Sequence, residues 1–449
     1  MTRGSEDSLV PLLPELRPGS APSTSDGGDK KQREVSVSSA VFNLSTSIIG
    51  AGIMSLPAAV KVLGVVPAFF LVAAAAFLAD TSAEYLTRYA GSGGVCSYAA
   101  TMGEAFGRVG STVLQICIAL TTAGVLTVDF DIIGDVLSGS QSADTVHAGV
   151  LQEWFGDQWW TTRAVALLVA VIFVILPLVL LRRVDSLRYT SAISVLLAVV
   201  FMLISSAMAV YALFQGKTET PRLLPDFDHL SSFLDLFSAV PVIVVAFTFH
   251  FNVHPIRAEL SKTSDMMVAV RISVVLCSVI YAAIGFFGYL LFGESTMADI
   301  LSNFDQDTGS PIGSLLNDVV RLSYVLHVVL VFPLLFFSLR INIDQLFFPK
   351  SKQLESATCR FMLLTAFLLA FIYLSSVLFP SIWTLFQFFG STTAVCISLI
   401  FPAAIVIRDV EGISKRKDKV LASVMIAVAV ITSSIAITSN IVTYLGERD

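Results

Sequence analysis

Long apolar runs are the feature of this sequence that most restricts its fold. An α-helix rises 1.5 Å per residue, so about 20 apolar residues cross the ~30 Å hydrocarbon core of a bilayer. Of the 449 residues, 55% are hydrophobic and only 14% are charged, whereas soluble chains carry roughly a quarter charged residues. The sequence therefore predicts an all-α, polytopic membrane protein. Its eleven expected transmembrane helices cover 37–62, 65–88, 109–138, 162–181, 188–214, 233–256, 268–292, 316–341, 358–379, 381–407 and 419–444.

The segment before the first run differs sharply in composition. Residues 1–36 are polar and rich in Ser, Pro, Gly and charge, so they cannot bury enough apolar area to order themselves. We expect a disordered cytosolic tail here rather than a signal peptide. The expected domain of eleven spans then covers 37–445, and 446–449 form a short lumenal or extracellular carboxyl terminus.

Basic residues indicate how the spans are oriented. With the amino terminus in the cytosol, the tail and the cytosolic connections hold 22 of the 28 Lys and Arg residues. Cytosolic connections of membrane proteins carry such an excess. The bias predicts a cytosolic amino terminus, a cytosolic loop at 408–419 and a carboxyl terminus on the far side.

Several classes of function are excluded or disfavoured by the residues present. The net charge of −6 argues against nucleic acid as a partner. No Cys pair shows metal-ligand spacing, and no nucleophile–base constellation appears, so we predict no catalytic residue, no metal site, no cofactor and no enzymatic activity. The lipid bilayer is the one partner that composition implies.

The first span contains an interruption. Gly50 and Gly52 lie at its midpoint, after a polar stretch that includes Asn43, Ser45 and Thr46. Two glycines weaken a helix where lipid offers no other hydrogen-bond partner, so a break here must face protein or a water-filled cavity. Close helix packing is the competing interpretation. We favour a discontinuous helix whose second half points free amides of Gly50–Gly52 at an anion.

The sixth span carries polar residues from mid-membrane to the cytosolic edge: Thr248, His250, Asn252 and His254. Buried polar and ionisable groups inside a membrane are candidates for function. Spans one and six occupy matching positions if the chain consists of two inverted halves of five helices plus one more. Paired broken helices at the midplane of such halves are typical of secondary transporters. The predicted fold is therefore a 5+5 inverted-repeat, LeuT-like transporter fold with broken helices 1 and 6.

Two motifs resemble the amino acid/auxin permease family of the amino acid–polyamine–organocation superfamily. The stretch 43–53, NLSTSIIGAGI, resembles the opening signature of that family, and 250–256, HFNVHPI, followed by Glu259-Leu260, resembles its sixth-span signature. The resemblance covers about 37–444. It is greatest to plant vacuolar-type members and to their sodium-coupled neutral amino acid relatives.

The resemblance implies proton- or sodium-coupled transport of an amino acid. Carried over residue by residue, the amides of Gly50, Ala51 and Gly52 take the substrate carboxylate. The remaining candidate residues, for the amine and the side-chain pocket, are Ser45, Thr46, Phe247, Thr248, Phe249, His250, Thr121 and Thr122.

Two departures from the sodium-coupled relatives bear on the coupling ion. Those relatives carry an Asn where this chain has Thr46, and a Thr where it has Val331. A valine removes one oxygen ligand, and hard cations need several. A proton is therefore favoured over sodium, with His250, His254 and Asp129 as candidate proton-coupling groups. Asp131 and Asp135 are four positions apart and share a helical face, and hydration in the outer turns is the expected state of Asp135.

Two alternatives stay open from the sequence. One is an amino acid sensor on the same fold, and the other is a sodium-coupled carrier of the plasma membrane. Residues 6–13, EDSLVPLL, resemble an acidic di-leucine sorting signal. With the plant vacuolar-type resemblance, this favours a vacuolar or other endomembrane location, from which the chain would export amino acids by alternating access.

Overall fold

The structure is a computed structural model of the whole chain. It describes residues 36–90, 97–141, 146–181, 188–225, 230–260, 262–305, 311–349, 351, 354–379 and 381–446. The predicted disordered tail therefore lies outside the described residues except for its last residue, as does the carboxyl terminus after residue 446.

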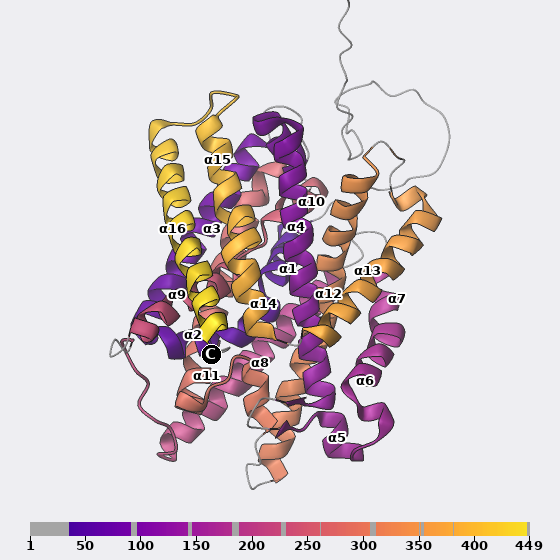
Figure 1. Cartoon of the computed structure of the whole chain (residues 1–449), viewed down its shortest axis with the longest axis vertical. Helices are drawn as coiled ribbons and strands as arrows, with labels where there is room; N and C mark the ends of the chain where they lie inside the picture. Colours follow the sequence, from indigo (N-terminus) through magenta and orange to yellow (C-terminus); the bar gives the residue numbers. More distant parts are fainter. Residues whose placement is uncertain are drawn as a thin grey trace, which may run out of the picture.

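Helices make up nearly all of the described chain (Figure 1). The α-helices are α1 (Val37–Ile48), α2 (Leu56–Leu63), α3 (Val65–Tyr89), α4 (Tyr98–Ser138), α5 (Val150–Phe155), α6 (Arg163–Ala170), α7 (Leu176–Val179), α8 (Arg188–Phe214), α9 (Leu230–Ala246), α10 (His250–Glu259), α11 (Met266–Phe292), α12 (Pro311–Phe347), α13 (Thr358–Leu378), α14 (Ile382–Phe389), α15 (Phe401–Arg408) and α16 (Arg416–Gly446). The strands β1 (Ser140–Gln141) and β2 (Val146–His147) form one small antiparallel hairpin.

Shorter helical turns connect or extend these elements. The 3₁₀ turns are η1 (Ala51–Ser55), η2 (Trp159–Thr161), η5 (Thr263–Asp265), η6 (Gly293–Ser295), η7 (Ile300–Asp305) and η8 (Leu354–Ser356), and the π-helical segments are η3 (Val171–Ile175), η9 (Gly390–Ala394) and η10 (Cys396–Ile400). The three π segments lie inside the fourth and tenth predicted spans, each of which also contains a proline, Pro177 or Pro402.

The polytopic, all-α prediction is confirmed, but the count of eleven spans is not. Among the described residues, nine helices are long and apolar enough to cross a membrane, and the bent pair Val37–Ile48 and Ala51–Leu63 makes a tenth. Arg163–Val179 is a shorter apolar helix at the position of the fourth expected span. The expected turn between the ninth and tenth spans is present, because α13 ends at Leu378 and α14 starts at Ile382.

The largest difference in helix bounds is at the start of the third span. We expected it to begin near residue 109, because Glu104 and Arg108 interrupt the apolar run. Instead α4 starts at Tyr98 and bends at Gly107, whose φ of 69° and ψ of −168° are not helical. Only glycine adopts such a positive φ without steric cost. Residues 98–106 thus form a separate helical segment ahead of the spanning helix.

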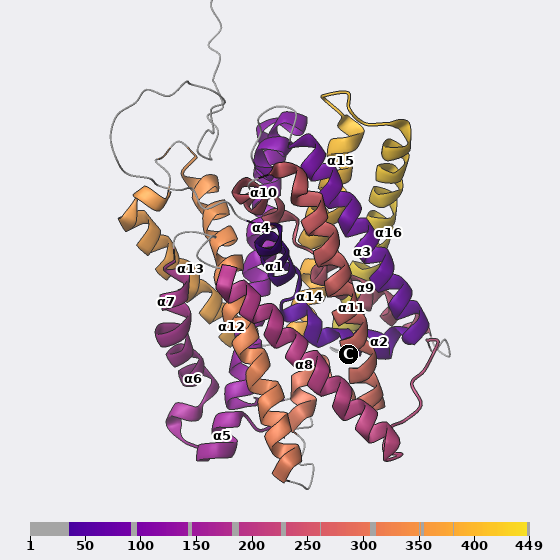
Figure 2. The same cartoon turned by 180° about the vertical axis from the view of Figure 1, so that it is seen from behind.

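The two broken helices are packed among longer helices (Figures 1 and 2). The helix α12 packs against α4 and α8, and α11 packs against α1, α3 and α8. The helix α9 contacts α2, α14 and α16. The first and sixth spans are therefore surrounded by protein, which is where an interrupted helix can satisfy its backbone groups without lipid contact.

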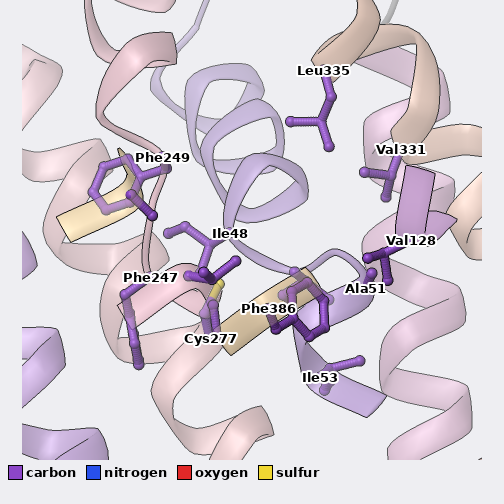
Figure 3. Close-up of a cluster of buried hydrophobic side chains, with 14 of the residues drawn as sticks. Ile48, Ala51, Ile53, Val128, Phe247, Phe249, Cys277, Val331, Leu335 and Phe386 are labelled. Carbon is purple, nitrogen blue, oxygen red and sulfur yellow. The ribbon is translucent and has the colours of Figure 1, made fainter. Parts of the chain in front are cut away.

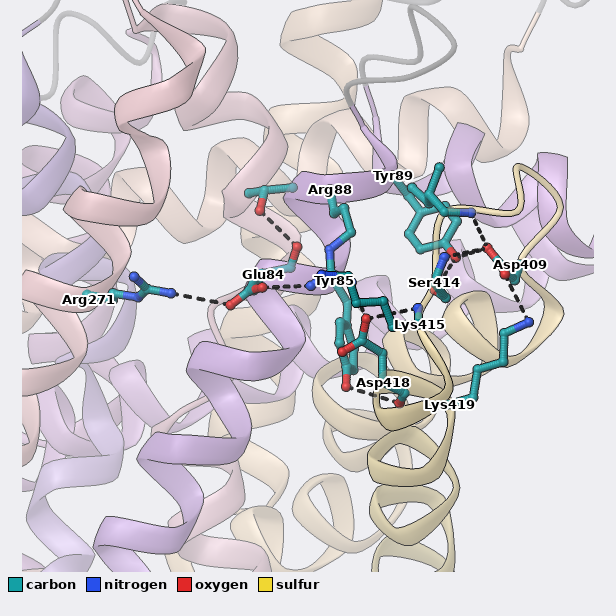
Figure 4. A network of polar contacts seen from close by, with 12 residues as sticks. Glu84, Tyr85, Arg88, Tyr89, Arg271, Asp409, Ser414, Lys415, Asp418 and Lys419 are labelled. Carbon is teal, nitrogen blue, oxygen red and sulfur yellow. Dashed lines mark hydrogen bonds and ion pairs between the residues drawn. The ribbon is translucent and has the colours of Figure 1, made fainter.

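A polar network joins α3, α11 and the connection between α15 and α16 at one end of the molecule (Figure 4). Arg88 pairs with Glu84 and with Asp418, at 2.7 Å each, and Arg271 of α11 lies 3.3 Å from Glu84. Tyr89 donates a hydrogen bond to Asp409, which also pairs with Lys419. We call this end of the molecule the tail side.

The tail side also holds the start of the first span. Ser273, two residues after Arg271, donates a hydrogen bond to the Val41 carbonyl of α1. From the 409–415 connection, α16 runs down the side of the molecule and ends in its lower half (Figure 1). The described amino-terminal helix and the 409–415 connection thus share one end, and the end of α16 lies away from it.

Candidate functional site

The first span is interrupted at its middle, as expected from its glycines. The helix α1 ends at Ile48, and Ile49 and Gly50 have extended backbone conformations. The chain continues as the 3₁₀ turn η1 and then as α2, and the two halves differ in direction by 51°. Pro57 lies in the first turn of α2, where its missing N–H is not needed. The span is therefore two half-helices with a non-helical joint.

The sixth span is also interrupted, although it has no glycine at the break. The helix α9 ends at Ala246, and α10 begins at His250. In the linker, the Phe247 N–H bonds back to the carbonyls of Ile243 and Val244, and the Thr248 N–H bonds to that of Val245. The Thr248 hydroxyl donates to the Val244 carbonyl. These bonds close the end of α9, so the chain leaves the helix although no glycine is present.

The two breaks touch each other. A Cβ atom added to Gly52 would lie 3.1 Å from Cα and from Cβ of Ala246, the last residue of α9. A side chain at this position would require the two backbones to move apart by a few tenths of an ångström. Gly52 therefore packs closely against α9 and also forms part of the break. At Gly50 an added Cβ would meet only Val331 of α12, at 4.0 Å.

Two tyrosines hold the breaks from outside. The Tyr281 hydroxyl of α11 lies within hydrogen-bonding distance of the Ile48 carbonyl at the end of α1 and of the Ala246 carbonyl at the end of α9. The Tyr324 hydroxyl of α12 donates to the Gly50 carbonyl at 2.8 Å. Both side chains are fully buried. Tyr281 binds carbonyls at the ends of α1 and α9, where a helix leaves its last carbonyls without an intrahelical partner. Tyr324 adds a second donor to the Gly50 carbonyl, which also accepts from the Ile53 N–H.

Unpaired backbone groups of opposite polarity remain at the two breaks. The N–H groups of Gly50, Ala51 and Gly52 donate to no other described residue, and the carbonyls of Phe247 and Thr248 accept from none. The three amides open the second half of the first span, where the helix dipole favours negative charge. Donors on one break thus lie next to acceptors on the other.

Apolar side chains surround these groups (Figure 3). Phe247 and Phe249 lie on one side of Ile48, and Val128 and Val331 lie on the other. All five side chains are buried. A low-dielectric surrounding of this kind strengthens each polar contact made inside it.

The predicted hydroxyl residues mostly bind protein groups already. Thr46 donates to the Ser191 carbonyl of α8 at 3.1 Å, and Thr122 donates to Ile118 of its own helix. Thr121 donates to the hydroxyl of Thr393 at 2.6 Å. The Ser45 hydroxyl is buried without a hydrogen-bond partner among the described residues. Thr46 and Thr122 are therefore oriented by helices α8 and α4.

The three predicted proton-coupling groups are buried, and the structure describes no hydrogen bond to any of their ionisable atoms. His250 begins α10 and lies beside the Ala79 backbone of α3. The His254 ring stacks on Tyr98 of α4, with centroids 5.9 Å apart. Asp129 of α4 is an electrostatic neighbour of the Tyr324 hydroxyl. His250 and His254 thus lie one turn apart on α10, whereas Asp129 lies on α4, and no contact joins the three into one cluster among the described residues.

On the tail side of the breaks, a chain of hydrogen bonds joins α1, α10 and α12. The Asn252 amide of α10 donates to Ser47 of α1 at 2.9 Å and accepts from Ser338 of α12. Asn252, Ser47 and Ser338 are all buried. These polar contacts hold α1, α10 and α12 together between the helix breaks and the tail side.

On the opposite side, Arg163 of α6 binds two carboxylates of α4. It lies 2.9 Å from Asp131 and 2.8 Å from Asp135. Asp131 is fully buried and also accepts from Ser376 of α13 at 2.6 Å. The expectation that Asp135 is simply hydrated is wrong, because its carboxylate pairs with Arg163 and its side chain is only 15% exposed. The Asp131 carboxylate lies inside the protein because a cation and a hydroxyl from two other helices compensate it.

Sequence reasoning missed Tyr281, Tyr324 and His327. A tyrosine or histidine within an apolar run gives no periodic signal of its own, and Tyr281 meets its partner carbonyls from 233 and 35 positions away. Spacing within α12 did contain a hint, because 324, 327 and 331 share one helical face. No group of three or more His, Cys, Asp or Glu residues suited to a metal ion occurs in the described part of the chain.

Comparison with known proteins agrees with this architecture. Over 430 residues the chain is 53% identical to amino acid transporter AVT6C of Arabidopsis thaliana, covering 96% of this chain and 97% of that protein. It is 51% identical to amino acid transporter AVT6D of the same plant, covering 98% of each.

Among solved structures the chain resembles a manganese transporter of Eremococcus coleocola, with a TM-score of 0.57 at 14% identity over 96% of this chain and 92% of that one. It also resembles a Na⁺-coupled sialic acid symporter, with a TM-score of 0.55 at 12% identity over 91% and 90% of the chains. At these identities the likeness shows the fold alone, which is the expected LeuT-like transporter fold. Residues 33–445 match the family described as transmembrane amino acid transporter protein. The chain therefore belongs to the transmembrane amino acid transporter family.

Proposed function

We propose that this amino acid transporter works by alternating access, is driven by protons and holds its substrate between the two helix breaks. The observation that carries the proposal is the pairing of unpaired amides at Gly50–Gly52 with unpaired carbonyls at Phe247 and Thr248. An α-amino acid presents a carboxylate and an ammonium group on adjacent atoms. The carboxylate suits the amides at the start of a half-helix, and the ammonium suits carbonyl oxygens.

The side chain of the substrate would extend from the breaks towards the ring of Phe249 and towards Thr121 and Thr122 of α4. Ser45, Thr46 and His250 complete the candidate set. Since Thr46 and Thr122 donate to α8 and α4 backbone carbonyls, they support the proposal as groups that shape the site. Transport would require the tail-side contacts of Asn252 to open and close during each cycle.

The residues near the breaks favour coupling to a proton over coupling to sodium. Val331 lies against Gly50, where an oxygen ligand would help to hold sodium, and Thr46 is bound to α8. His250, His254 and Asp129 are buried ionisable groups near the breaks. A bare ionised group in such surroundings is costly, so these groups would be neutral until a cation or a partner arrives.

Uptake into proteoliposomes that contain the purified full chain tests this function. A panel of labelled amino acids is offered with and without a pH gradient, and with sodium replaced by choline. We expect accumulation that follows the pH gradient and is unaffected by choline. The methyl ester of the transported amino acid should not compete, because it has no carboxylate. Steep sodium dependence at fixed pH contradicts the proton linkage, and substrate binding without any flux would instead indicate a sensor.

We further propose that the chain resides in the vacuolar or another endomembrane and exports amino acids from that compartment. The sorting-signal resemblance at residues 6–13 supports this location. Fractionation of cells that express the tagged chain, before and after replacement of Leu12 and Leu13 by alanine, tests it. A plasma-membrane location of the unaltered chain contradicts it.

A further inference from the structure

The imidazole of His327 is a buried ionisable group that the proposal above does not use. His327 lies on α12, one helical turn before Val331, and its side chain is fully buried. Its Nδ1 atom lies 2.7 Å from the Ser194 carbonyl oxygen of α8. A carbonyl oxygen only accepts hydrogen bonds, so Nδ1 carries the ring proton. In the neutral ring, Nε2 is then the bare acceptor nitrogen.

The Nε2 atom is buried and makes no hydrogen bond of normal geometry among the described residues, and the Ile49 backbone at the break of α1 also faces the ring. The groups around the ring are oxygen-bearing and uncharged. The Tyr324 ring lies 5.1 Å away, and its hydroxyl donates to the Gly50 carbonyl. Thr46 of α1 contacts both the Ser191 carbonyl and the Ser194 hydroxyl of α8. Carbonyl and hydroxyl oxygens favour a positive charge placed among them.

Few other ionisable groups face this position. On α12 itself the neighbour is Tyr324, whose hydroxyl is influenced electrostatically by Asp129 of α4, Tyr281 of α11 and Asp299 before η7. The described part of α1 contains no ionisable side chain, and α8 presents Ser191 and Ser194 here. Among the described residues no fixed positive charge acts on the ring, so a proton on Nε2 would meet only neutral or acidic neighbours.

We propose that Nε2 of His327 is the proton-binding atom of the transport cycle. This inference rests on the proposed proton-linked function, and it names the group that carries the proton. The protonated ring places a positive charge between α12 and the break of α1, next to the amides that would hold the substrate carboxylate. The protonated ring would stand in place of a coupling metal cation, and the apolar side chain of Val331 supplies no oxygen ligand there.

Proton and substrate then bind cooperatively. An imidazolium attracts a carboxylate at the adjacent break, and the bound carboxylate raises the affinity of Nε2 for its proton by the same factor. Coupling between linked sites is typically about 5- to 150-fold. On the acidic side of the membrane both ligands would load together, and on the more alkaline side the proton would leave Nε2 and weaken substrate binding.

The test uses His327→Asn in the full chain. An asparagine amide at this position keeps a donor near Nδ1 for the Ser194 carbonyl but cannot take up a proton. Proteoliposomes are loaded with the labelled amino acid that the wild type takes up fastest. We expect accumulation driven by the pH gradient to fall at least about tenfold, towards the level without a gradient. Exchange of labelled for unlabelled substrate at equal pH and saturating substrate should persist, since exchange needs no net proton movement, while its KM should rise by the coupling factor of about 5- to 150-fold.

The same replacement at His250 and at His254 provides the comparison. If either abolishes gradient-driven accumulation while His327→Asn keeps it, the inference is wrong. If His327→Asn does not fold, as judged by size-exclusion chromatography, two other measurements test the inference. These are the same uptake assay with His327→Gln and calorimetry of the unaltered protein. For the unaltered protein, calorimetry in buffers of different ionisation enthalpy should detect proton uptake on binding of that amino acid. Absence of uptake at pH 6–7 overturns the inference.

The outcomes separate this inference from the proposed function. If the wild type accumulates no substrate under a pH gradient, the proton linkage itself is wrong. If the wild type does so and His327→Asn does so equally, the linkage stands and only the assignment to His327 fails.

Discussion

The glycines of the first span provide a matched pair of substitutions that separates substrate binding from packing. A methyl group at position 50 would meet only Val331, at an ordinary contact distance of 4.0 Å. A methyl group at position 52 would lie 3.1 Å from two carbon atoms of Ala246. The optimal carbon–carbon distance is about 3.5–4.0 Å. Gly52→Ala therefore forces the breaks apart by a few tenths of an ångström, and Gly50→Ala does not.

The two variants should differ in stability. Overpacking of this size typically costs about 1–3 kcal/mol, which we expect as a lower unfolding temperature for Gly52→Ala. Gly50 has a φ of −134°, in the extended region, so alanine there should change the free energy of unfolding by less than about 1 kcal/mol.

Transport should respond in the opposite order. The methyl group of Gly50→Ala occupies space beside the amides that we propose for the substrate carboxylate. Loss of one hydrogen bond to a charged group costs about 1.5–3 kcal/mol, which corresponds to a rise in KM of about 10- to 100-fold. Both variants are purified in detergent, compared by thermal unfolding and reconstituted for uptake. Unchanged KM and rate for a stable Gly50→Ala variant would refute the assignment of the carboxylate to this break.

Three further predictions concern other parts of the chain. Arg163→Met leaves the fully buried Asp131 without its cation, so we expect a loss of about 3–5 kcal/mol in unfolding free energy, part of which Asp131→Asn in the same background should restore. Burial raises the pKa of Asp299, in the loop between α11 and α12, to about 7. The folded state therefore binds this proton more tightly than the unfolded state, and stability falls as pH rises from about 4 to about 7; a denaturation series in which Asp299→Asn keeps the same slope contradicts this. In a Cys-free background, an impermeant maleimide should label Ile413→Cys and Lys217→Cys from opposite sides of the membrane, and labelling of both from one side contradicts the orientation derived from basic residues.

The positions of the spans follow from local composition, which is why they were predictable. Apolar runs such as 188–214 coincide with α8, because a bilayer requires a helix of about that length wherever the run occurs. The break of the first span was predictable for a similar reason, since Gly50 and Gly52 act on their own backbone. The start of α4 was not, because charged residues hid a helical turn that bends at Gly107.

The break of the sixth span depends on local bonds and also on a contact from another helix. Its sequence holds polar residues but no glycine, and its linker is held by the Thr248 hydroxyl and by Tyr281 of α11. Tyr281 stands next to both breaks only because α11 packs against α1 and lies beside the end of α9. The two breaks therefore lie side by side because of how the helices pack against one another.

The sequence by itself determined the class of protein, the limits of most spans and the residues of one break, since each depends on neighbours along the chain. Tertiary structure alone decided which polar groups are already satisfied and which remain available. Asp131 is bound by Arg163, 32 positions away, and His327 meets Ser194, 133 positions away. An ionisable side chain in an apolar run looks the same in sequence whether it is compensated or not. The difference lies in the partner that another helix brings to it, because the low dielectric of the interior makes an unpaired charge costly and a paired one stable.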